Sequence, residues 1–358
     1  MNVKSRAKVG AAVLGAAALG VGVMSTPASA DYSTPPWRAL AGVGSDTTQY
    51  VVNGLGEVAV DAAGNKIIGS WDAVPPTGAT TTITPKDPAT SPHCANIVRP
   101  NGSSAGIDRL NAEVADTTTS DCVDFARSSR GPSTAGTNLT FIPFGKDAVT
   151  YATDLGSTLP TNLTTAQLAS IYKTCTYLDA AGATQTVSKA LLPQSGSGTR
   201  TYWLTSIGVT EAQIATAKAA GCVDDTVQEH DGTAIASGTQ IMPMSVAQWL
   251  AQGKGLTNVP NRRGESRLRS IEGTAPTTGT GTAIELNPNF FFSRDVYNVV
   301  PTTKITGATA DATLVRAFVG ATSQVCANIA TTKTYGFGDL SADTGASSCG
   351  DTNLTGNR

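Results

Sequence analysis

The sequence is poor in the residues that metal and nucleotide chemistry require. It holds only two histidines, His93 and His230, and its cysteines form no C-x-x-C motif. Zinc sites need such ligands in close spacing, so no metal is expected. No Gly-Lys-Ser/Thr triplet follows the glycine-rich segments, which argues against a nucleotide-binding P-loop. We therefore expect a protein without cofactors.

Charged residues are also scarce, at 15% of the chain. There are 25 Lys and Arg against 27 Asp and Glu, for a net charge of −2. Three of the basic residues lie within the first 30, so the rest of the chain is more acidic. A mildly acidic chain does not attract nucleic acid or anionic membranes through bulk charge. Any anion that it binds must be held by local geometry.

Only one long apolar run is present, from Val9 to Met24, and it follows a basic start. The small residues of 28–30 close this segment, which predicts a secretory signal peptide cleaved after Ala30. An N-terminal membrane anchor is the alternative, but the run is short for a span. The next residue is Asp31 rather than Cys, so we expect a secreted, extracellular protein without a lipid anchor.

All six cysteines follow the predicted signal peptide. An even number in an exported chain predicts disulfides, although six cysteines allow 15 pairings. We expect neighbours along the chain to pair, because each such link closes a loop of moderate length. The expected pairs are Cys94–Cys122, Cys175–Cys222 and Cys326–Cys349.

Short apolar segments alternate with segments of helical periodicity, which indicates an α/β protein with mixed sheets. Expected strands include Ala39 to Gly44, Cys122 to Ser129 and Arg294 to Pro301. The segment Leu139 to Thr153 contains Pro-Phe-Gly and predicts a strand, a turn and a second strand. Expected helices follow Asp46 and lie within 102–114, 164–175, 211–220, 246–254 and 312–323.

Three segments share one design, because each is rich in Gly, Ser and Thr and opens a predicted helix. They are "GVGSDTTQ" (42–49), "NGSSAGI" (101–107) and "SGSGTRTYW" (195–203). A helix start leaves backbone N–H groups unpaired and carries partial positive charge. A single such segment is explained by ordinary helix capping. Three in one chain predict a site that binds an anion.

A fourth segment, "DFARSSRGP" (124–132), places two arginines around two serines at the end of a predicted strand. A guanidinium group matches the oxygens of phosphate. Surface ion pairs are the alternative for these arginines. Arg200 follows the third segment, and it either points into the site or braces a hinge.

These four segments, in this order, resemble the exported phosphate-binding proteins of ABC transporters, which have the type II periplasmic-binding-protein fold. "PFGKDAV" and "LTTAQLASIY" match as well, and "SGSGT" is the most specific element. The resemblance implies two α/β lobes that clamp an oxyanion in the cleft, and an ABC permease as a partner. The predicted ligand-binding residues are Ser45, Asp46, Thr47, Ser103, Ser104, Arg127, Ser128, Ser129, Ser197, Gly198, Thr199 and Arg200.

The chain also departs from the family pattern at three positions. Asp46 stands where the family has a neutral hydroxyl residue, and Ser129 where it has the aspartate that accepts a proton from hydrogen phosphate. Pro193 stands where the family has an arginine. These departures suggest that the carboxylate has moved to Asp46 and that Arg127 or Arg200 replaces the arginine. A protonated anion is then favoured over sulfate, which Asp46 would repel.

The expected arrangement is a signal peptide over 1–30, one lobe from 31–146 and 290–358, and a second lobe from 147–289. The expected function is binding of phosphate or a similar oxyanion by hinge closure, for uptake or sensing, by a monomer that catalyses no reaction. One alternative is a secreted phosphate-ester hydrolase, although "SGSGT" lacks the serine-elbow pattern and His230 fits a triad only by chance. The other is a surface interaction protein that has lost ligand binding.

Overall fold

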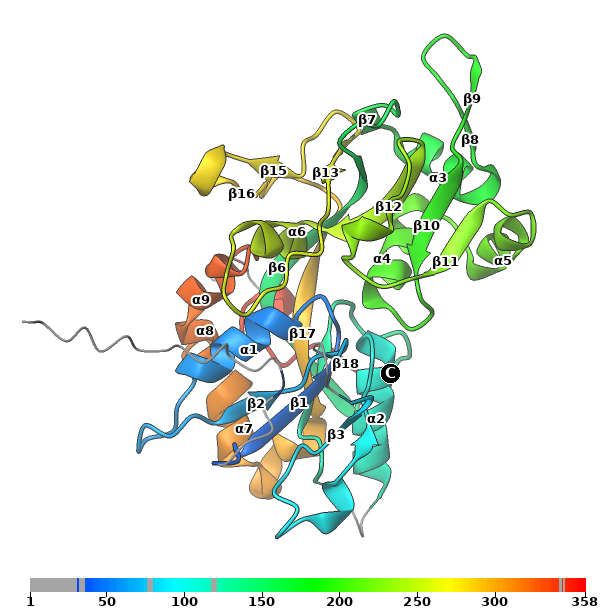
Figure 1. Ribbon diagram of the computed structural model, residues 1–358. Helices are drawn as coiled ribbons and strands as arrows, with labels where there is room; N and C mark the ends of the chain where they lie inside the picture. The colour runs from blue at the N-terminus through cyan, green and yellow to red at the C-terminus, as the bar shows by residue number, and fades with distance from the viewer. Residues whose placement is uncertain (1–30, 32–35, 76–79, 117–120, 341–342, 344) are drawn as a thin grey trace, which may run out of the picture.

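A computed structural model describes residue 31 and residues 36–75, 80–116, 121–340, 343 and 345–358. The chain forms two α/β lobes, with the blue, cyan, orange and red segments in one and the green and yellow segments in the other (Figure 1). One lobe contains α1 (Gln49–Val58), α2 (Ser103–Ala115), α7 (Ala312–Phe318), α8 (Gln324–Ala327) and α9 (Ile329–Thr334). The other contains α3 (Thr165–Thr174), α4 (Gly198–Ile207), α5 (Glu211–Ala219) and α6 (Val246–Gly253). The predicted α/β fold with mixed strand directions is confirmed.

One sheet passes through both lobes, in the strand order β11-β10-β12-β6-β17-β5-β1-β2. In chain order the strands are β1 (Leu40–Gly44), β2 (Ile68–Ser70), β5 (Phe125–Ser128), β6 (Leu139–Asp154), β10 (Lys189–Pro193), β11 (Val223–Val227), β12 (Gln240–Ser245) and β17 (Ser293–Pro301). Two further strands, β13 (Ser266–Leu268) and β18 (Thr355–Gly356), pair with β6. Small two-stranded sheets join β3 (Thr82–Ile83) to β4 (Ile97–Val98), β7 (Asn162–Leu163) to β14 (Ser270–Ile271), β8 (Thr176–Leu178) to β9 (Thr184–Thr186), and β15 (Thr277–Thr278) to β16 (Glu285–Leu286).

The lobes are joined by β6 and β17, which pair antiparallel. At 16 residues, β6 spans roughly 50 Å, so one strand reaches from the first lobe into the second. The predicted turn within this segment was wrong, because Pro143 and Gly145 lie inside a continuous strand. Pro143 pairs with Tyr297 where the register of β17 shifts, and a proline that lacks an N–H group is tolerated at such a bulge.

Each lobe has its own hydrophobic core. Trp203 of α4 is fully buried and packs edge-on against Tyr172 and Phe292 in the second lobe. In the first lobe, Phe125 of β5 packs against Phe318 of α7. Ala247 and Ala251 of α6 pack against the core of the first lobe. Buried polar side chains lie between the lobes as well, among them Thr47, Thr199 and Arg294.

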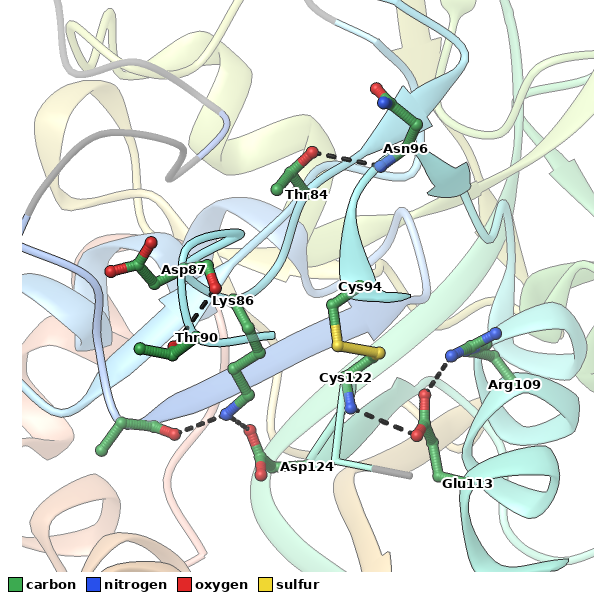
Figure 2. The surroundings of a disulfide bond; sticks show 11 residues. Thr84, Lys86, Asp87, Thr90, Cys94, Asn96, Arg109, Glu113, Cys122 and Asp124 are labelled. Atoms are coloured by element: carbon green, nitrogen blue, oxygen red, sulfur yellow. Dashed lines mark hydrogen bonds and ion pairs between the residues drawn. A yellow bond between two sulfur atoms is a disulfide. The ribbon is translucent and has the colours of Figure 1, made fainter. Parts of the chain in front are cut away.

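The six cysteines form the three pairs expected from the sequence. Figure 2 shows Cys94–Cys122, which ties a loop of the first lobe to the segment that enters β5. Nearby, the Lys86 ammonium contacts the Asp124 carboxylate at 2.5 Å, and Glu113 accepts a hydrogen bond from the backbone N–H of Cys122. These links hold the start of β5 in place, and the residue that follows its other end, Ser129, lies between the lobes.

No helix among the described residues has the length and apolarity needed to cross a membrane. The predicted signal peptide, 1–30, lies outside the described residues.

Candidate functional site

Serine and threonine hydroxyls from four segments meet between the lobes. Thr47 precedes α1, Ser103 opens α2, and Ser129 follows β5, all in the first lobe. Ser197 and Thr199, at the start of α4, face them from the second lobe. These five residues are each 0% exposed. The structure therefore brings together the hydroxyl residues of all four sequence segments.

Two contacts cross between the lobes. Thr47 Oγ1 of the first lobe lies 3.2 Å from Thr199 Oγ1 of the second. The backbone N–H of Ser104 donates to the carbonyl oxygen of Gly196 in the opposite lobe at 3.1 Å. Within the first lobe, Ser103 Oγ lies 3.3 Å from Ser129 Oγ. The lobes are thus closed on each other.

Local sequence explains why two helices begin at the cleft. Ser197 is the N-cap of α4, and its Oγ accepts a hydrogen bond from the Arg200 backbone N–H at 2.9 Å. Gly102, just before α2, has a φ of 96°, and a Cβ there would lie 2.9 Å from the Gly196 carbonyl oxygen. Only glycine adopts this φ easily while allowing such a close approach of two backbones.

Neither arginine favoured from the sequence points into the cleft. Arg127 is 0% exposed, and its guanidinium donates to the carbonyl oxygens of Gly42, Gly44 and Ser45. Arg200 turns outward, where it pairs with Glu211 at 2.6 Å and also donates to the Pro193 carbonyl oxygen. The first arginine holds the end of β1 in place, and the second fastens the start of α4 to its own lobe.

Other predicted residues are divided between the cleft and supporting roles. Ser128 Oγ accepts from the Arg130 backbone N–H and donates to its carbonyl oxygen, so it closes a turn. Ser104 Oγ accepts from the Arg130 guanidinium at 3.1 Å. Ser45 Oγ is buried and has no hydrogen-bond partner among the described residues. Gly198 lies against Ser103 and Ser129, so it belongs to the cleft.

The arginine that enters the cleft is Arg294, in β17. Its Nη2 lies 2.9 Å from Thr199 Oγ1 and 3.5 Å from Thr47 Oγ1. The same nitrogen pairs with Asp147 Oδ2 at 2.9 Å, and Nη1 is buried without a partner among the described residues. Arg294 therefore contacts a hydroxyl from each lobe and keeps a free donor.

A buried carboxylate and an imidazole complete the site, from the loop that follows β11. Glu229 and His230 are both 0% exposed, and His230 has a left-handed φ of 57°, which is uncommon for a non-glycine residue. Thr47 Oγ1 lies 3.2 Å from Glu229 Oε2 and 3.0 Å from His230 Nε2. Glu229 Oε1 has no hydrogen-bond partner in the described part of the chain.

The hydrogen bonds fix the proton on His230. The Ser245 backbone N–H donates to Nδ1 at 3.3 Å, so Nδ1 is unprotonated and Nε2 carries the proton. Nε2–H faces Thr47 Oγ1 at 3.0 Å and Glu229 Oε2 at 3.2 Å, and Thr47 Oγ1 donates to the same Glu229 oxygen. Burial alone would raise the pKa of Glu229, but the hydrogen bond and charge of His230, followed by Ser197 and the charge of Arg294, lower its pKa from the ordinary value.

Asp46 is buried, but its carboxylate is already paired. Oδ1 lies 3.3 Å from Arg262 Nη2, and Oδ2 accepts a hydrogen bond from Gln228 Nε2 at 3.3 Å. Gln248 of α6 donates to the Thr47 carbonyl oxygen at 2.5 Å. These contacts all cross between the lobes and favour the closed arrangement.

Sequence reasoning missed Arg294 and Glu229. Arg294 was placed correctly in a strand, near where the chain was expected to return to the first lobe, but its local sequence gave no sign that its guanidinium enters the cleft. Glu229 and His230 stand in "VQEHDG", where adjacent Glu and His residues before Asp-Gly were the one available signal. Two adjacent titratable residues in a predicted turn are otherwise expected at the surface.

Asp72 supplies a pH dependence next to this site. Burial raises its pKa to about 7, despite a hydrogen bond from Asn53 and the nearby charge of Arg127. The folded state thus holds the proton more tightly than the unfolded chain, whose aspartates have a pKa of about 3.9. Stability should fall as the pH rises from about 4 to about 7, by up to about 4 kcal/mol, and level off above.

Asp72→Asn should remove this decline, because a neutral amide still accepts the hydrogen bond from Asn53. Urea denaturation across that pH range measures the difference from the wild type, which should grow with pH. Asp121→Asn, at a side chain that is 72% exposed, is the matched control. An unchanged difference at all pH values would contradict the assignment.

Comparison with known proteins shows the family to which this chain belongs. Residues 57–320 match the family described as the PBP superfamily domain. No curated protein matches. Among solved structures, an ABC-type phosphate transport receptor from Vibrio cholerae has 16% identity and a TM-score of 0.51, over 84% of this chain and 99% of that one.

A second similar structure is a putative phosphate ABC transporter substrate-binding protein from Clostridium perfringens, with bound phosphate. It has 12% identity and a TM-score of 0.47, over 84% of this chain and 99% of that one. At 16% identity, the likeness to the Vibrio cholerae structure supports the fold alone.

Proposed function

Because this chain belongs to the PBP superfamily, we propose that it is a solute-binding protein that clamps phosphate or a similar protonated oxyanion between its lobes. The observation that supports this most is the set of five buried hydroxyls from both lobes, two of which, on Thr47 and Thr199, contact Arg294. Such donors replace water around an anion at little cost in reorganisation. The solved structures of similar fold include phosphate-binding proteins, which agrees with the proposal.

Binding would proceed by hinge closure. We assign 31–146 and 290–358 to one lobe and 147–289 to the other, with the hinge in β6 and β17. Only the closed state lets one anion contact Ser103 and Ser129 from one side and Ser197 and Thr199 from the other. A ligand that contacts both lobes shifts the population toward closure. Secretion, delivery to an ABC permease and a monomeric state belong to this proposal.

Glu229 is the proposed proton acceptor for the ligand, in place of Asp46. Its Oε1 is buried and free, whereas both oxygens of Asp46 are already occupied by Arg262 and Gln228. A ligand O–H group would satisfy Oε1, and a fully deprotonated anion such as sulfate would be repelled.

The geometry does not favour a hydrolase. His230 carries its proton on Nε2, the nitrogen that faces Thr47, so it is a donor there and not a general base. Its Nδ1 accepts from a backbone N–H rather than donating to a carboxylate. The arrangement is suited to holding an anion and gives no activated nucleophile.

Titration calorimetry with phosphate and sulfate at about pH 7.5 tests the proposal. The wild type should bind phosphate about a hundredfold more tightly than sulfate, a difference of about 2.7 kcal/mol. Glu229→Gln should reduce this ratio to about tenfold or less, because the amide also offers a donor to sulfate. Asp46→Asn is the matched control and should keep the ratio. Absence of phosphate binding would refute the function, and a changed ratio in Asp46→Asn would refute the role of Glu229.

A further inference from the structure

A groove runs between the lobes directly outside the buried hydroxyls. One part, of about 520 Å³, is lined by Arg130 and Tyr297 from the first lobe and by Thr201 and Tyr202 from the second. A second part, of about 240 Å³, shares Arg130 and Thr201 and adds further polar residues. We call these two parts together the outer groove.

The outer groove is built from the next residues of the segments that form the clamp. Ser104 follows Ser103, and Arg130 follows Ser129; both Ser104 and Arg130 line the groove. Arg294 lines it as well, while its Nη2 contacts Thr199 Oγ1 inside the clamp. Consecutive Cα atoms lie about 3.8 Å apart, so a group in the groove is only a few bonds from an anion in the clamp.

Arg130 gives the outer groove a positive charge. The residue is 7% exposed, and its guanidinium donates only to the Gly131 carbonyl oxygen and Ser104 Oγ. No carboxylate pairs with it among the described residues. Burial lowers its pKa, as does the nearby charge of Arg358, and the charge of Asp108 opposes them.

The other charged groups of the outer groove are mostly paired already. Glu211 is held by Arg200, and Arg358 by Asp108 at 2.7 Å. Asp295 lies in the wider part, where burial raises its pKa. Tyr202 stacks its ring on Arg294, at 5.4 Å from the guanidinium carbon to the ring centre, and forms an apolar wall. Arg130 is therefore the group in the groove that lacks a counter-ion.

We propose that the ligand is an organic phosphate monoester that carries a carboxylate, with its phosphoryl group in the clamp and its carboxylate on Arg130. This rests on the proposed function, because it places the phosphoryl group among the same hydroxyls. A guanidinium fork matches a carboxylate in two parallel hydrogen bonds. The aromatic wall and the hydroxyls of Thr201 and Ser133 suit a short, hydroxylated carbon chain between the two charges.

Two probes that differ in one group test this directly. 3-Phosphoglycerate has a carboxylate where glycerol 3-phosphate has a CH2OH group, and inorganic phosphate reports on the clamp alone. In titration calorimetry, the wild type should prefer 3-phosphoglycerate over glycerol 3-phosphate by about tenfold or more, since an ionic hydrogen-bonded pair contributes at least about 1.5 kcal/mol.

Arg130→Met should abolish this preference, and Arg130→Lys should keep part of it. Arg267→Met, at an exposed arginine far along the chain, is the matched control and should keep the full preference. Thermal melting verifies that each variant is folded.

The outcomes separate the two proposals. Equal binding of both esters by the wild type, or a preference that survives in Arg130→Met, overturns the carboxylate subsite. Binding of inorganic phosphate without either ester overturns the outer groove as a ligand site and leaves the oxyanion function standing. Failure of all three probes to bind overturns the proposed function and the subsite with it.

Discussion

Arg294→Met should bind phosphate about a hundredfold more weakly than the wild type, or worse. Arg294 is the one cation that contacts Thr47 and Thr199 together, and its Nη1 is a buried donor without a partner in the described chain. A charge-assisted hydrogen bond contributes about 1.5–3 kcal/mol, and a ligand oxygen would take at least one from each nitrogen. Titration calorimetry measures the loss.

The loss of Arg294 also affects stability, because Asp147 is 0% exposed and would remain as a buried charge. Breaking such a pair costs about 3–5 kcal/mol. The double variant Asp147→Asn/Arg294→Met removes both charges, so it should regain stability without regaining affinity. This separation distinguishes a ligand contact from a folding defect.

Arg200→Met is the matched control, since Arg200 is equally buried but pairs with Glu211 and Asp225 away from the cleft. Its phosphate affinity should stay within about threefold of the wild type, or about 0.6 kcal/mol. Normal binding by the double variant, or a loss in Arg200→Met as large as in Arg294→Met, would show that the cationic contact has been misassigned.

Gly198→Ala should prevent closure of the lobes and lower phosphate affinity by about fiftyfold or more, about 2.3 kcal/mol. A Cβ at this position would lie 2.3 Å from Ser129 Oγ and 2.4 Å from Ser103 Oγ, both in the opposite lobe. Carbon and oxygen atoms do not approach so closely, so the lobes must move apart unless both serine side chains turn away. In either case the ligand loses the closed arrangement of hydroxyls.

Small-angle scattering measures closure of the lobes directly. Phosphate should reduce the radius of gyration of the wild type but not that of Gly198→Ala. The clash exists only between the lobes, so the variant should melt close to the wild-type temperature in the absence of ligand. Gly131→Ala, where the backbone is not left-handed and a Cβ would meet no atom closer than 3.9 Å, is a control for the cost of replacing a glycine. If phosphate reduced the radius of gyration of Gly198→Ala as much as that of the wild type, hinge closure at this contact would be contradicted.

Local patterns were sufficient to predict most of the elements and the segments whose hydroxyls meet between the lobes. Thr164 and Gln167 form a capping box where α3 begins, at the start of the segment in which a helix was expected. Ser103, Ser197 and Thr199 could be identified because helix starts rich in Gly, Ser and Thr leave a local signature. The cysteine pairs likewise join neighbours along the chain.

The charged half of the site could not be predicted in the same way. Arg127 and Arg294 both belong to strands, and nothing in their local sequence shows which guanidinium enters the cleft. In the fold, Arg127 meets the carbonyl oxygens of β1, which use up its donors, whereas Arg294 lies on β17 where that strand leaves the second lobe. Which groups an arginine side chain meets therefore depends on the order of the strands in the sheet, which the local sequence does not show.

An α/β chain, three disulfide pairs and several helix starts rich in Gly, Ser and Thr could be predicted from the sequence, because capping and periodicity act over a few residues. The folded structure was needed to place Glu229, His230 and Arg294 among those hydroxyls and to show that Asp46 pairs with Arg262. These residues lie up to 247 positions apart, and contacts over such separations are set by how β6 and β17 bring the lobes together.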